Sequence, residues 1–298
     1  MSASRKLIVL PMTLLVFIGV VLSSCRPSGD LLSQIRERGT IRISTDTNYA
    51  PQSEQVPNAQ RMADTLCAAD QLTANQLQGF DIGVAVEIAR RLNVEPCFVT
   101  PKWETIVTGD WGGGWDISVG SMTITRDRQE KLWFTPAYYF TPAQLAARKG
   151  SGIHSVTDVS GKAVCVGAAT TYETYLNGQD LGIPDSDIKV SAPKGVSVIP
   201  LETDAKCVEA IQTGTTEFEA FMTAGNVVDQ AIADGVDIEK IGTPVYVENL
   251  AVAIDKKSPI DPRSLLDAIG KIINDMHADG TLKTISMKWF GMDRTVAP

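Results

Sequence analysis

The chain has 298 residues and carries 27 Lys and Arg against 35 Asp and Glu, so its formal net charge is −8 at pH 7. Hydrophobic residues make up 44% of the chain and charged residues 21%, a globular composition that excludes wholesale disorder and fibrous repeats. This length favours two compact units. Because phosphate binding depends on clustered Lys and Arg, and no such cluster occurs, the acidic balance argues against a nucleic-acid partner.

The N-terminus has the pattern of an export signal. Arg5 and Lys6 precede an uncharged apolar run, residues 7–22, that ends in small residues. A membrane anchor is the weaker alternative, because the run contains Pro11 and is shorter than the roughly 20 residues of a spanning helix.

The end of this run resembles the lipobox of bacterial lipoproteins. Its sequence is Leu-Ser-Ser-Cys at residues 22–25, which implies cleavage before Cys25 and a lipid on the Cys25 sulfur. A plain export signal with an incidental cysteine is the other possibility. We expect a signal peptide at residues 1–24 and a lipidated tether at residues 25–30, which would hold the protein outside the cytoplasm on a membrane.

The first half of the exported chain alternates helices and strands. Asp30 can cap a helix that stops at Gly39, and residues 41–45 alternate as a strand. Residues 48–78 are typical of a loop, with two prolines and few large apolar side chains. An apolar stripe then predicts a helix over residues 82–92, and buried strands are expected at residues 97–99 and 117–119. This order predicts an α/β fold with a largely parallel sheet.

The second half has the pattern of an inserted lobe. Two apolar segments, residues 144–148 and 246–254, bracket a block with expected strands at residues 163–166 and 188–190 and a helix at residues 205–211. A final helix with apolar residues over 265–276 completes the first unit. We therefore predict one lobe from residues 31–141 and 246–298, a second lobe from residues 142–245, and a hinge of two crossing segments.

Besides Cys25, the exported chain has four cysteines, an even number in an oxidising compartment, which predicts two disulfides. Of the three possible pairings we favour Cys67 with Cys97 and Cys165 with Cys207, since each bridge then stays within one predicted lobe. A zinc site is a weak alternative, because no CxxC occurs and the histidines lie far from the cysteines in sequence.

Several strings in order along the chain carry a resemblance to a known family. They lie at residues 41–51, 79–82, 115–117, 121–128, 170–173, 279–281 and 288–291. Together they resemble the family 3 extracellular solute-binding proteins, the polar amino-acid receptors of ABC importers. The resemblance implies a two-lobed, type II periplasmic-binding-protein fold, with a mostly parallel sheet flanked by helices in each lobe and a two-strand hinge. Some members of the family carry a disulfide where Cys165 and Cys207 lie.

The resemblance also implies a function. It implies a monomer that needs no cofactor or metal, captures a small carboxylate-bearing solute by hinge closure and delivers it to a membrane permease, without being an enzyme. The solute is expected to be a polar or basic amino acid. Two alternatives stay open: a dehydratase-like enzyme on the same scaffold, with Glu173 or Asp46 as its acid or base, and a ligand-sensing protein.

Arg128 is the best candidate for binding a carboxylate. A receptor for an amino acid needs a planar cation for the carboxylate and an acid or other acceptor for the ammonium. Arg128 follows a hydroxyl-bearing turn at the end of an expected buried strand, where open α/β sheets place ligands. The resemblance puts Ser121 and Thr123 on the same carboxylate. The alternatives are a surface ion pair of Arg128 with Asp127 or Glu130, and ordinary turn bonding by the two hydroxyls.

Thr170 and Glu173 form a capping-box pattern, which predicts a helix start with free N–H groups that favour an anion. The resemblance places Thr170 and Thr171 on the second lobe's face of the pocket, completing the carboxylate cage. A purely structural cap is the alternative for the Thr170 side chain.

Three further residues are expected in the pocket from the resemblance. Asp46 would receive a positive group, and Tyr49 and Trp103 would form aromatic walls that attract cations. Core packing is the alternative for Trp103.

One stretch departs from the family pattern. Relatives place an Asp in the second lobe to hold the α-ammonium of the solute, but residues 219–225 contain no Asp, and the candidates Met222, Thr223 and Ala224 are not acidic. An α-amino acid therefore requires Thr223, backbone carbonyls or another acid in that role; otherwise the solute lacks a free α-amine. An unpaired charge in a closed pocket is costly, so this position bears on specificity.

Overall fold

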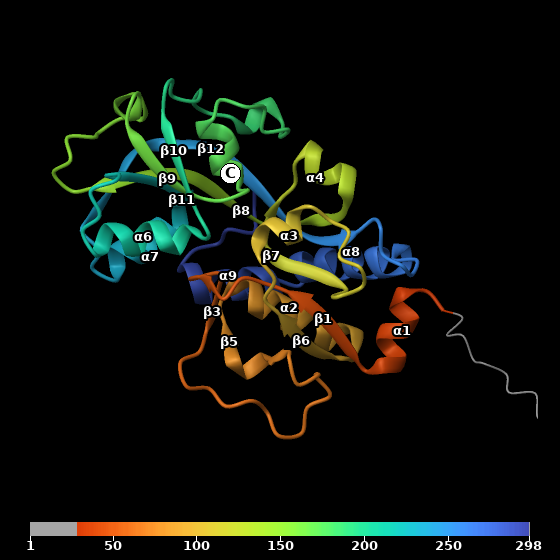
Figure 1. The fold of residues 1–298 in the computed structure, drawn as a ribbon. Helices are drawn as coiled ribbons and strands as arrows, with labels where there is room; N and C mark the ends of the chain where they lie inside the picture. Colours follow the sequence, from red (N-terminus) through yellow and green to blue (C-terminus); the bar gives the residue numbers. More distant parts are fainter. Residues whose placement is uncertain (1–28, 298) are drawn as a thin grey trace, which may run out of the picture.

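The structure of the chain is a computed structural model that describes residues 29–297 (Figure 1). The expected signal peptide, Cys25 and the tether up to residue 28 lie outside the described residues. Within residues 29–297, no helix is both long enough and apolar enough to cross a bilayer.

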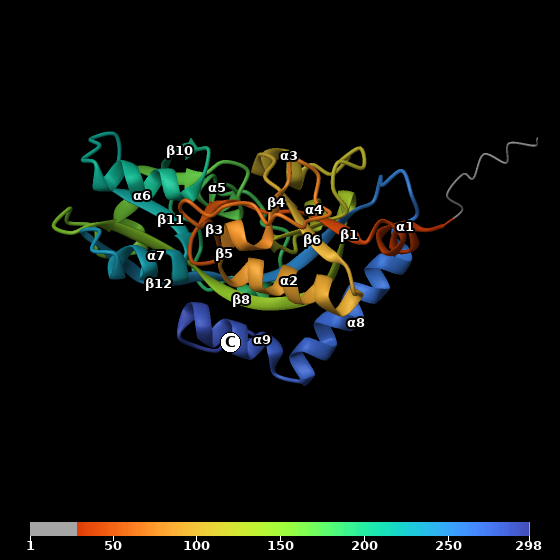
Figure 2. The ribbon, with the colours of Figure 1, turned by 90° about the horizontal axis from the view of Figure 1, so that it is seen from below.

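A mixed sheet of nine strands, in the order β10-β9-β11-β8-β12-β7-β1-β6-β4, runs through both lobes. In the first lobe, β1 (Thr40–Ser44) pairs in parallel with β6 (Glu95–Val99) and β7 (Ile117–Thr123). The helices α1 (Leu31–Arg38), α2 (Phe80–Leu92), α8 (Arg263–Ala278) and α9 (Thr281–Phe290) contribute apolar faces to the buried core around this part of the sheet. Figure 2 shows α8 and α9 beside each other on one side of the molecule.

The predicted ends of α1 follow from local hydrogen bonding and backbone conformation. The Asp30 side chain accepts a hydrogen bond from the Ser33 N–H (2.9 Å), and α1 ends where Gly39 adopts a left-handed conformation with φ 72°. The apolar stripe expected in residues 82–92 is buried in α2, which also begins two residues earlier.

The second lobe has a parallel trio of strands, β10 (Ser197–Leu201), β9 (Ala163–Gly167) and β11 (Ala220–Ala224). Its helices are α5 (Thr171–Leu176), α6 (Asp204–Gln212) and α7 (Gly225–Ala233). Figure 1 shows α6 and α7 at the far end of the molecule from α1.

Two long antiparallel strands join the lobes. These are β8 (Leu132–Arg148) and β12 (Ile238–Asp255), which pair along most of their length, with Glu248 opposite Thr141. The two expected crossings are therefore continuous strands. The two-lobed fold is as predicted from the resemblance, and the numerical lobe boundaries stay a prediction.

Two expectations about individual elements are wrong. Residues 48–78 are not only a loop: they contain β2 (Asn48–Tyr49), β3 (Ser53–Gln55), β4 (Leu72–Thr73) and β5 (Leu77–Gln78), of which β4 joins the edge of the large sheet. Residues 188–190 do not form a sheet strand. The N–H groups of Lys189 and Val190 both donate to the Val245 carbonyl, whereas consecutive N–H groups of a regular strand point to opposite sides, and Ile188 forms only an isolated bridge.

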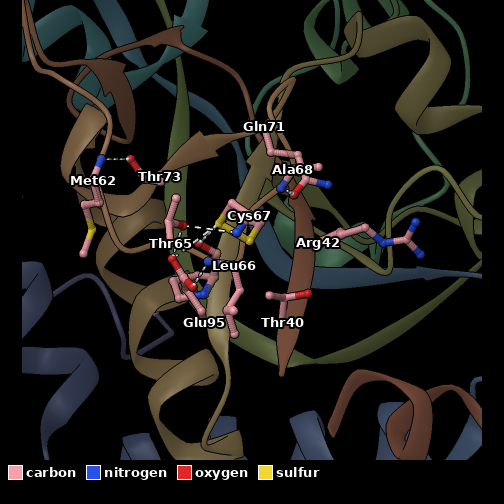
Figure 3. The surroundings of a disulfide bond; sticks show 12 residues. Thr40, Arg42, Met62, Thr65, Leu66, Cys67, Ala68, Gln71, Thr73 and Glu95 are labelled. Atoms are coloured by element: carbon pink, nitrogen blue, oxygen red, sulfur yellow. Dashed lines mark hydrogen bonds between the residues drawn. A yellow bond between two sulfur atoms is a disulfide. The ribbon is translucent and has the colours of Figure 1, made fainter. Parts of the chain in front are cut away.

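Both favoured disulfides are present, which leaves these four cysteines unavailable for a zinc site. Cys67 is bonded to Cys97 and Cys165 to Cys207, with Cα–Cα distances of 5.3 and 5.7 Å. Figure 3 shows how the first bridge and Glu95 hold the loop around Cys67. The Glu95 carboxylate accepts hydrogen bonds from the Thr65 hydroxyl and from the Leu66 N–H (2.8 Å), so β6 fixes a segment that has few apolar contacts of its own.

Candidate ligand-binding site

A pocket lies where the two lobes meet at the hinge strands. Every residue predicted for ligand binding lines it, together with residues that the sequence did not single out. Its lining consists of Asp46, Tyr49, Trp103, Gly120, Ser121, Thr123, Arg128, Gly167, Ala168, Thr170, Thr171, Tyr172, Glu202, Thr203, Asp204 and Glu248. The structure thus brings the predicted residues together, while their contact with a ligand stays a prediction.

Arg128 lies on α4 (Arg126–Lys131), a short helix that begins after the N-cap Thr125. Arg128 is only 8% exposed, and its guanidinium donates to the carbonyl oxygens of Thr123 (3.1 Å) and Ala169 (3.2 Å). It lies 5.4 Å above the ring of Trp103. Within residues 29–297 no carboxylate forms an ion pair with Arg128, and burial lowers the pKa of its guanidinium. The alternative of a surface ion pair with Asp127 or Glu130 does not fit this geometry.

The segment before α5 joins the lobes through one carbonyl group. The Ala169 oxygen accepts from both Arg128 and the Trp103 indole N–H (3.2 Å), which belong to the first lobe. The Thr170 hydroxyl caps α5 by accepting from the Glu173 N–H (3.3 Å), and the Glu173 carboxylate accepts from the Ala169 N–H (2.7 Å). The return bond of the capping box thus comes from the N–H of Ala169, one residue before the N-cap Thr170, and it fixes Ala169 in its left-handed conformation.

Ser121 is held by a buried network within the first lobe. Its φ of 55° is unusual for a residue other than glycine. The Ser121 hydroxyl donates to the Asp81 carboxyl (2.7 Å) and lies 2.5 Å from the Tyr139 hydroxyl, while the Ser121 N–H donates to the Tyr138 hydroxyl (3.1 Å). Burial raises the pKa of Asp81 to about 7. The network therefore fixes a strained residue at the pocket wall.

Glu248 is a buried acid on the hinge strand β12, 2% exposed. One carboxylate oxygen accepts from the hydroxyls of Thr123 (2.6 Å) and Thr171 (2.7 Å), and the other accepts from the Tyr172 hydroxyl (2.7 Å). Burial raises the pKa of Glu248, and these hydrogen bonds and the positive charge of Arg128 oppose that rise.

Asp204 is the buried acid of the second lobe. It lies in the first turn of α6 and accepts from the Gly167 N–H (2.8 Å) and from the Thr223 hydroxyl (2.8 Å). A Cβ on Gly167 would lie 2.5 Å from Asp204 Oδ1, so a side chain at that position would displace the Asp204 carboxyl group. Burial raises the pKa of Asp204 to about 7. Asp204 of α6 is therefore hydrogen-bonded to Thr223 in residues 219–225, the stretch that lacks the Asp of the family pattern.

Asp46 and Tyr49 complete the wall on the first lobe's side. The Asp46 carboxylate accepts from the Asn48 N–H (2.8 Å), and burial raises its pKa. The Tyr49 hydroxyl lies 3.4 Å from the Tyr172 hydroxyl of the second lobe. Exposed Glu202 faces the same pocket and forms an ion pair with Lys102 at 3.5 Å.

Glu248 and Asp204 were not expected in the pocket from the sequence, although one of them carries a signal. Glu248 lies inside the apolar segment of residues 246–254, and a charged residue within such a segment is the informative exception. Asp204 begins a helix, where an Asp is typical of a cap and gives no sign of a pocket. Within the described residues, no group of three or more His, Cys, Asp or Glu side chains is arranged to hold a metal ion.

Two lobes joined by two strands, with a polar pocket at the junction, define the type II periplasmic binding protein fold. Solved structures with this fold match most of the chain. An arginine-binding protein from T. maritima, solved as its P235GK mutant, has a TM-score of 0.70 at 20% identity over 87% of this chain and 99% of that one. The ancestral amino acid-binding protein AncCDT-1, described as a precursor of cyclohexadienyl dehydratase, has a TM-score of 0.69 at 25% identity, with 87% of this chain and 99% of that chain covered.

The chain belongs to the bacterial extracellular solute-binding proteins, family 3, which it matches over residues 69–292. It is 26% identical to the L-cystine-binding protein TcyJ of Escherichia coli (strain K12), over 89% of this chain and 88% of the relative. It is also 26% identical to the histidine-binding periplasmic protein of Salmonella typhimurium, over 85% of this chain and 88% of the relative. By their names, these relatives are binding proteins, and the resemblance stated from the sequence is confirmed.

Proposed function

We propose that this protein captures a polar or basic amino acid outside the cytoplasm and delivers it to an ABC importer. The observation that carries the proposal is the position of Arg128, a buried cation without an ion-pair partner in the described residues, in a pocket between two lobes. A planar guanidinium there matches the carboxylate of an amino acid. Ser121 and Thr170 line the same pocket and are the further candidates for that end of the solute.

The charges of the pocket support the preference for a basic solute. Four acids, Asp46, Glu202, Asp204 and Glu248, line it beside the single cation Arg128. The aromatic faces of Tyr49 and Trp103 favour a cationic group as well. The relatives whose names mention L-cystine and histidine support an amino acid as the solute.

Capture would proceed by closure of the lobes about β8 and β12. Arg128 and Trp103 of the first lobe donate to Ala169 of the second, so the closed form has contacts that an open form lacks. A solute that adds contacts to both lobes shifts the population toward the closed form, which the permease would recognise. We further propose a monomer anchored to the membrane by a lipid on Cys25, with lobes at residues 31–141 plus 246–298 and 142–245.

A thermal-shift screen over amino acids, amines and dipeptides tests the proposal. We expect stabilisation by amino acids with a free carboxylate, most strongly by basic or polar ones, and none by amines without a carboxylate. Stabilisation by no amino acid would contradict the proposal.

A second candidate is an enzyme of the dehydratase type. It is favoured by the likeness to AncCDT-1 and by Asp204, whose pKa of about 7 suits a general acid or base. Mass spectrometry of the bound amino acid before and after incubation separates the two functions, because a receptor returns it unchanged and an enzyme converts it.

A further inference from the structure

Glu248 determines which way two pocket hydroxyls point their hydrogen atoms. A threonine hydroxyl has one hydrogen to donate and two lone pairs. Thr123 and Thr171 both donate to the same oxygen of Glu248, at 2.6 and 2.7 Å, and both side chains line the pocket. Any further partner in the pocket therefore meets the lone pairs of these hydroxyls and must itself donate.

This direction of hydrogen bonding, with the lone pairs of the hydroxyls left for a ligand, is the reverse of what the resemblance implies for the two threonines. A ligand carboxylate can only accept hydrogen bonds, so it gains nothing from hydroxyls whose hydrogens are already bound to Glu248. An ammonium group can only donate, and it would find two hydroxyl oxygens and a carboxylate together. The cluster of Glu248, Thr123 and Thr171 thus has the chemistry of a cation site.

We propose that Glu248, together with Thr123 and Thr171, holds the α-ammonium of the bound amino acid from the hinge strand, in place of the second-lobe acid that residues 219–225 lack. The inference rests on the proposed function above. The carboxylate of the amino acid remains the partner of Arg128.

The connection between Glu248 and Arg128 supports this assignment. Arg128 donates to the carbonyl oxygen of Thr123 (3.1 Å), and the hydroxyl of the same residue donates to Glu248 (2.6 Å). One residue therefore joins the cation that would bind the carboxylate to the acid that would bind the ammonium. In an α-amino acid these two groups are attached to the same carbon, so their partners must lie close together.

Asp204 is less suited to the same role. Both of its hydrogen-bond partners, Gly167 and Thr223, belong to the second lobe. Neither of them joins Asp204 to Arg128 as Thr123 joins Glu248.

The test compares Glu248→Gln with Glu239→Gln. The Glu248→Gln substitution keeps the shape of the side chain and removes its charge. The new amide oxygen can accept from the threonines, and the amide NH2 can donate to the Tyr172 hydroxyl, which then accepts instead of donating. Glu239 is an acid of the same strand that is absent from the pocket lining. Binding of L-arginine, L-histidine and L-cystine, and of the arginine analogue without its α-amine, is measured by calorimetry.

We expect Glu248→Gln to weaken binding of the amino acids about 10-fold to 100-fold and to remove most of the preference for L-arginine over its deaminated analogue. Glu239→Gln should leave both unchanged. Equal affinities in the Glu248→Gln variant and the wild type, or loss of the preference in Asp204→Asn instead, would overturn the assignment.

Two outcomes separate this inference from the proposed function. If the wild type binds none of these three and is stabilised by no amino acid in the screen, the proposed function fails and the subsite with it; if it binds an amino acid and Glu248→Gln changes nothing, only the subsite fails. Should Glu248→Gln not fold, the wild type alone still decides the question, because equal binding of L-arginine and its deaminated analogue overturns the subsite.

Discussion

Asp81 and Glu248 are both buried carboxyl groups bound by hydroxyls, and they differ in where those hydroxyls come from. Asp81 accepts from Ser121 and Tyr138, which belong to the first lobe's side of the sheet. Glu248 accepts from Thr123 on β7 and from Thr171 and Tyr172 on α5, so its partners lie in both lobes. The first network can persist whatever the second lobe does, whereas the second network exists only while the lobes are in contact.

The same division applies to other polar contacts of the pocket. Arg128 and Trp103 bind Ala169 across the lobes, and the Arg126 N–H donates to the Gly182 carbonyl (2.9 Å). Changes to the cross-lobe set should alter affinity, and changes to the one-lobe set should alter stability. Three variants, two of them with a matched control, test this separation, from the largest expected effect to the smallest.

Arg128→Ala should weaken amino-acid binding roughly 100-fold, because it removes a buried charged partner of the carboxylate. The melting temperature without ligand should change little, since Arg128 forms no ion pair within the described residues. Calorimetric titration with the best amino acid from the screen measures the affinity. Lys131→Ala, an exposed change on the same helix, is the control. An unaltered affinity in Arg128→Ala would remove Arg128 from the site.

Gly182→Ala should weaken binding about 10-fold by hindering closure. A Cβ at this position would lie 2.9 Å from the Arg126 nitrogen of the other lobe. The closed form would therefore be disfavoured by about 1 to 2 kcal/mol, while an open form would not meet the clash. Affinity is measured by calorimetry, and the population of closed molecules by small-angle X-ray scattering.

Gly178→Ala is the matched control for that variant. Gly178 has φ 68° and Gly182 has φ 63°, so an alanine is strained by a similar amount at either position, about 1 to 2 kcal/mol. A Cβ on Gly178 would have no neighbour within 4 Å. Both variants should lose similar stability, and only Gly182→Ala should lose affinity. Similar affinities in the two variants would show that the cross-lobe contact does not govern binding.

The fold could be predicted from the sequence where the signals are local. Asp30, Gly39 and the apolar stripe of α2 each act within one or two helical turns, and the structure has these elements close to the expected positions. The error at residues 188–190 has a physical reason: whether a short alternating segment joins a sheet depends on the partner it meets. Here the segment meets the carbonyl group of Val245 and forms one isolated bridge, from Ile188 to Tyr246.

The pocket, like the fold, could be predicted only where its residues lie close together in the sequence. Ser121, Thr123 and Arg128 lie in one strand–turn–helix unit, so their convergence is encoded within a few residues. Glu248 and Asp204 reach the pocket from β12 and α6, far along the chain, through pairings that no local pattern reveals. The direction in which the Thr123 and Thr171 hydroxyls donate depends on Glu248, so it could not be predicted from the motifs of the two threonines either.

Asp81→Asn should change the pH dependence of stability while leaving affinity nearly unaltered. The pKa of Asp81 is raised from 3.8 to about 7 by burial, so between these values the folded protein holds a proton that the unfolded chain releases. The stability that this proton provides is present below the unfolded pKa and is lost as the pH rises through the folded pKa, at about 1.4 kcal/mol per pH unit. Asp204, whose pKa is raised in the same way, lowers the stability with rising pH too, and it is still present in Asp81→Asn.

Urea unfolding of the unliganded protein at several pH values from about 4 to 8 measures this dependence. The unfolding free energy should decline less steeply with pH in Asp81→Asn, because the amide mimics the protonated acid toward Ser121 and Tyr138. If the unfolding free energy falls equally steeply with pH in the wild type and in Asp81→Asn, Asp81 is ionised in the folded protein. If Asp81→Asn loses much of its affinity, the Asp81 network acts on ligand binding as well as on the stability of the first lobe.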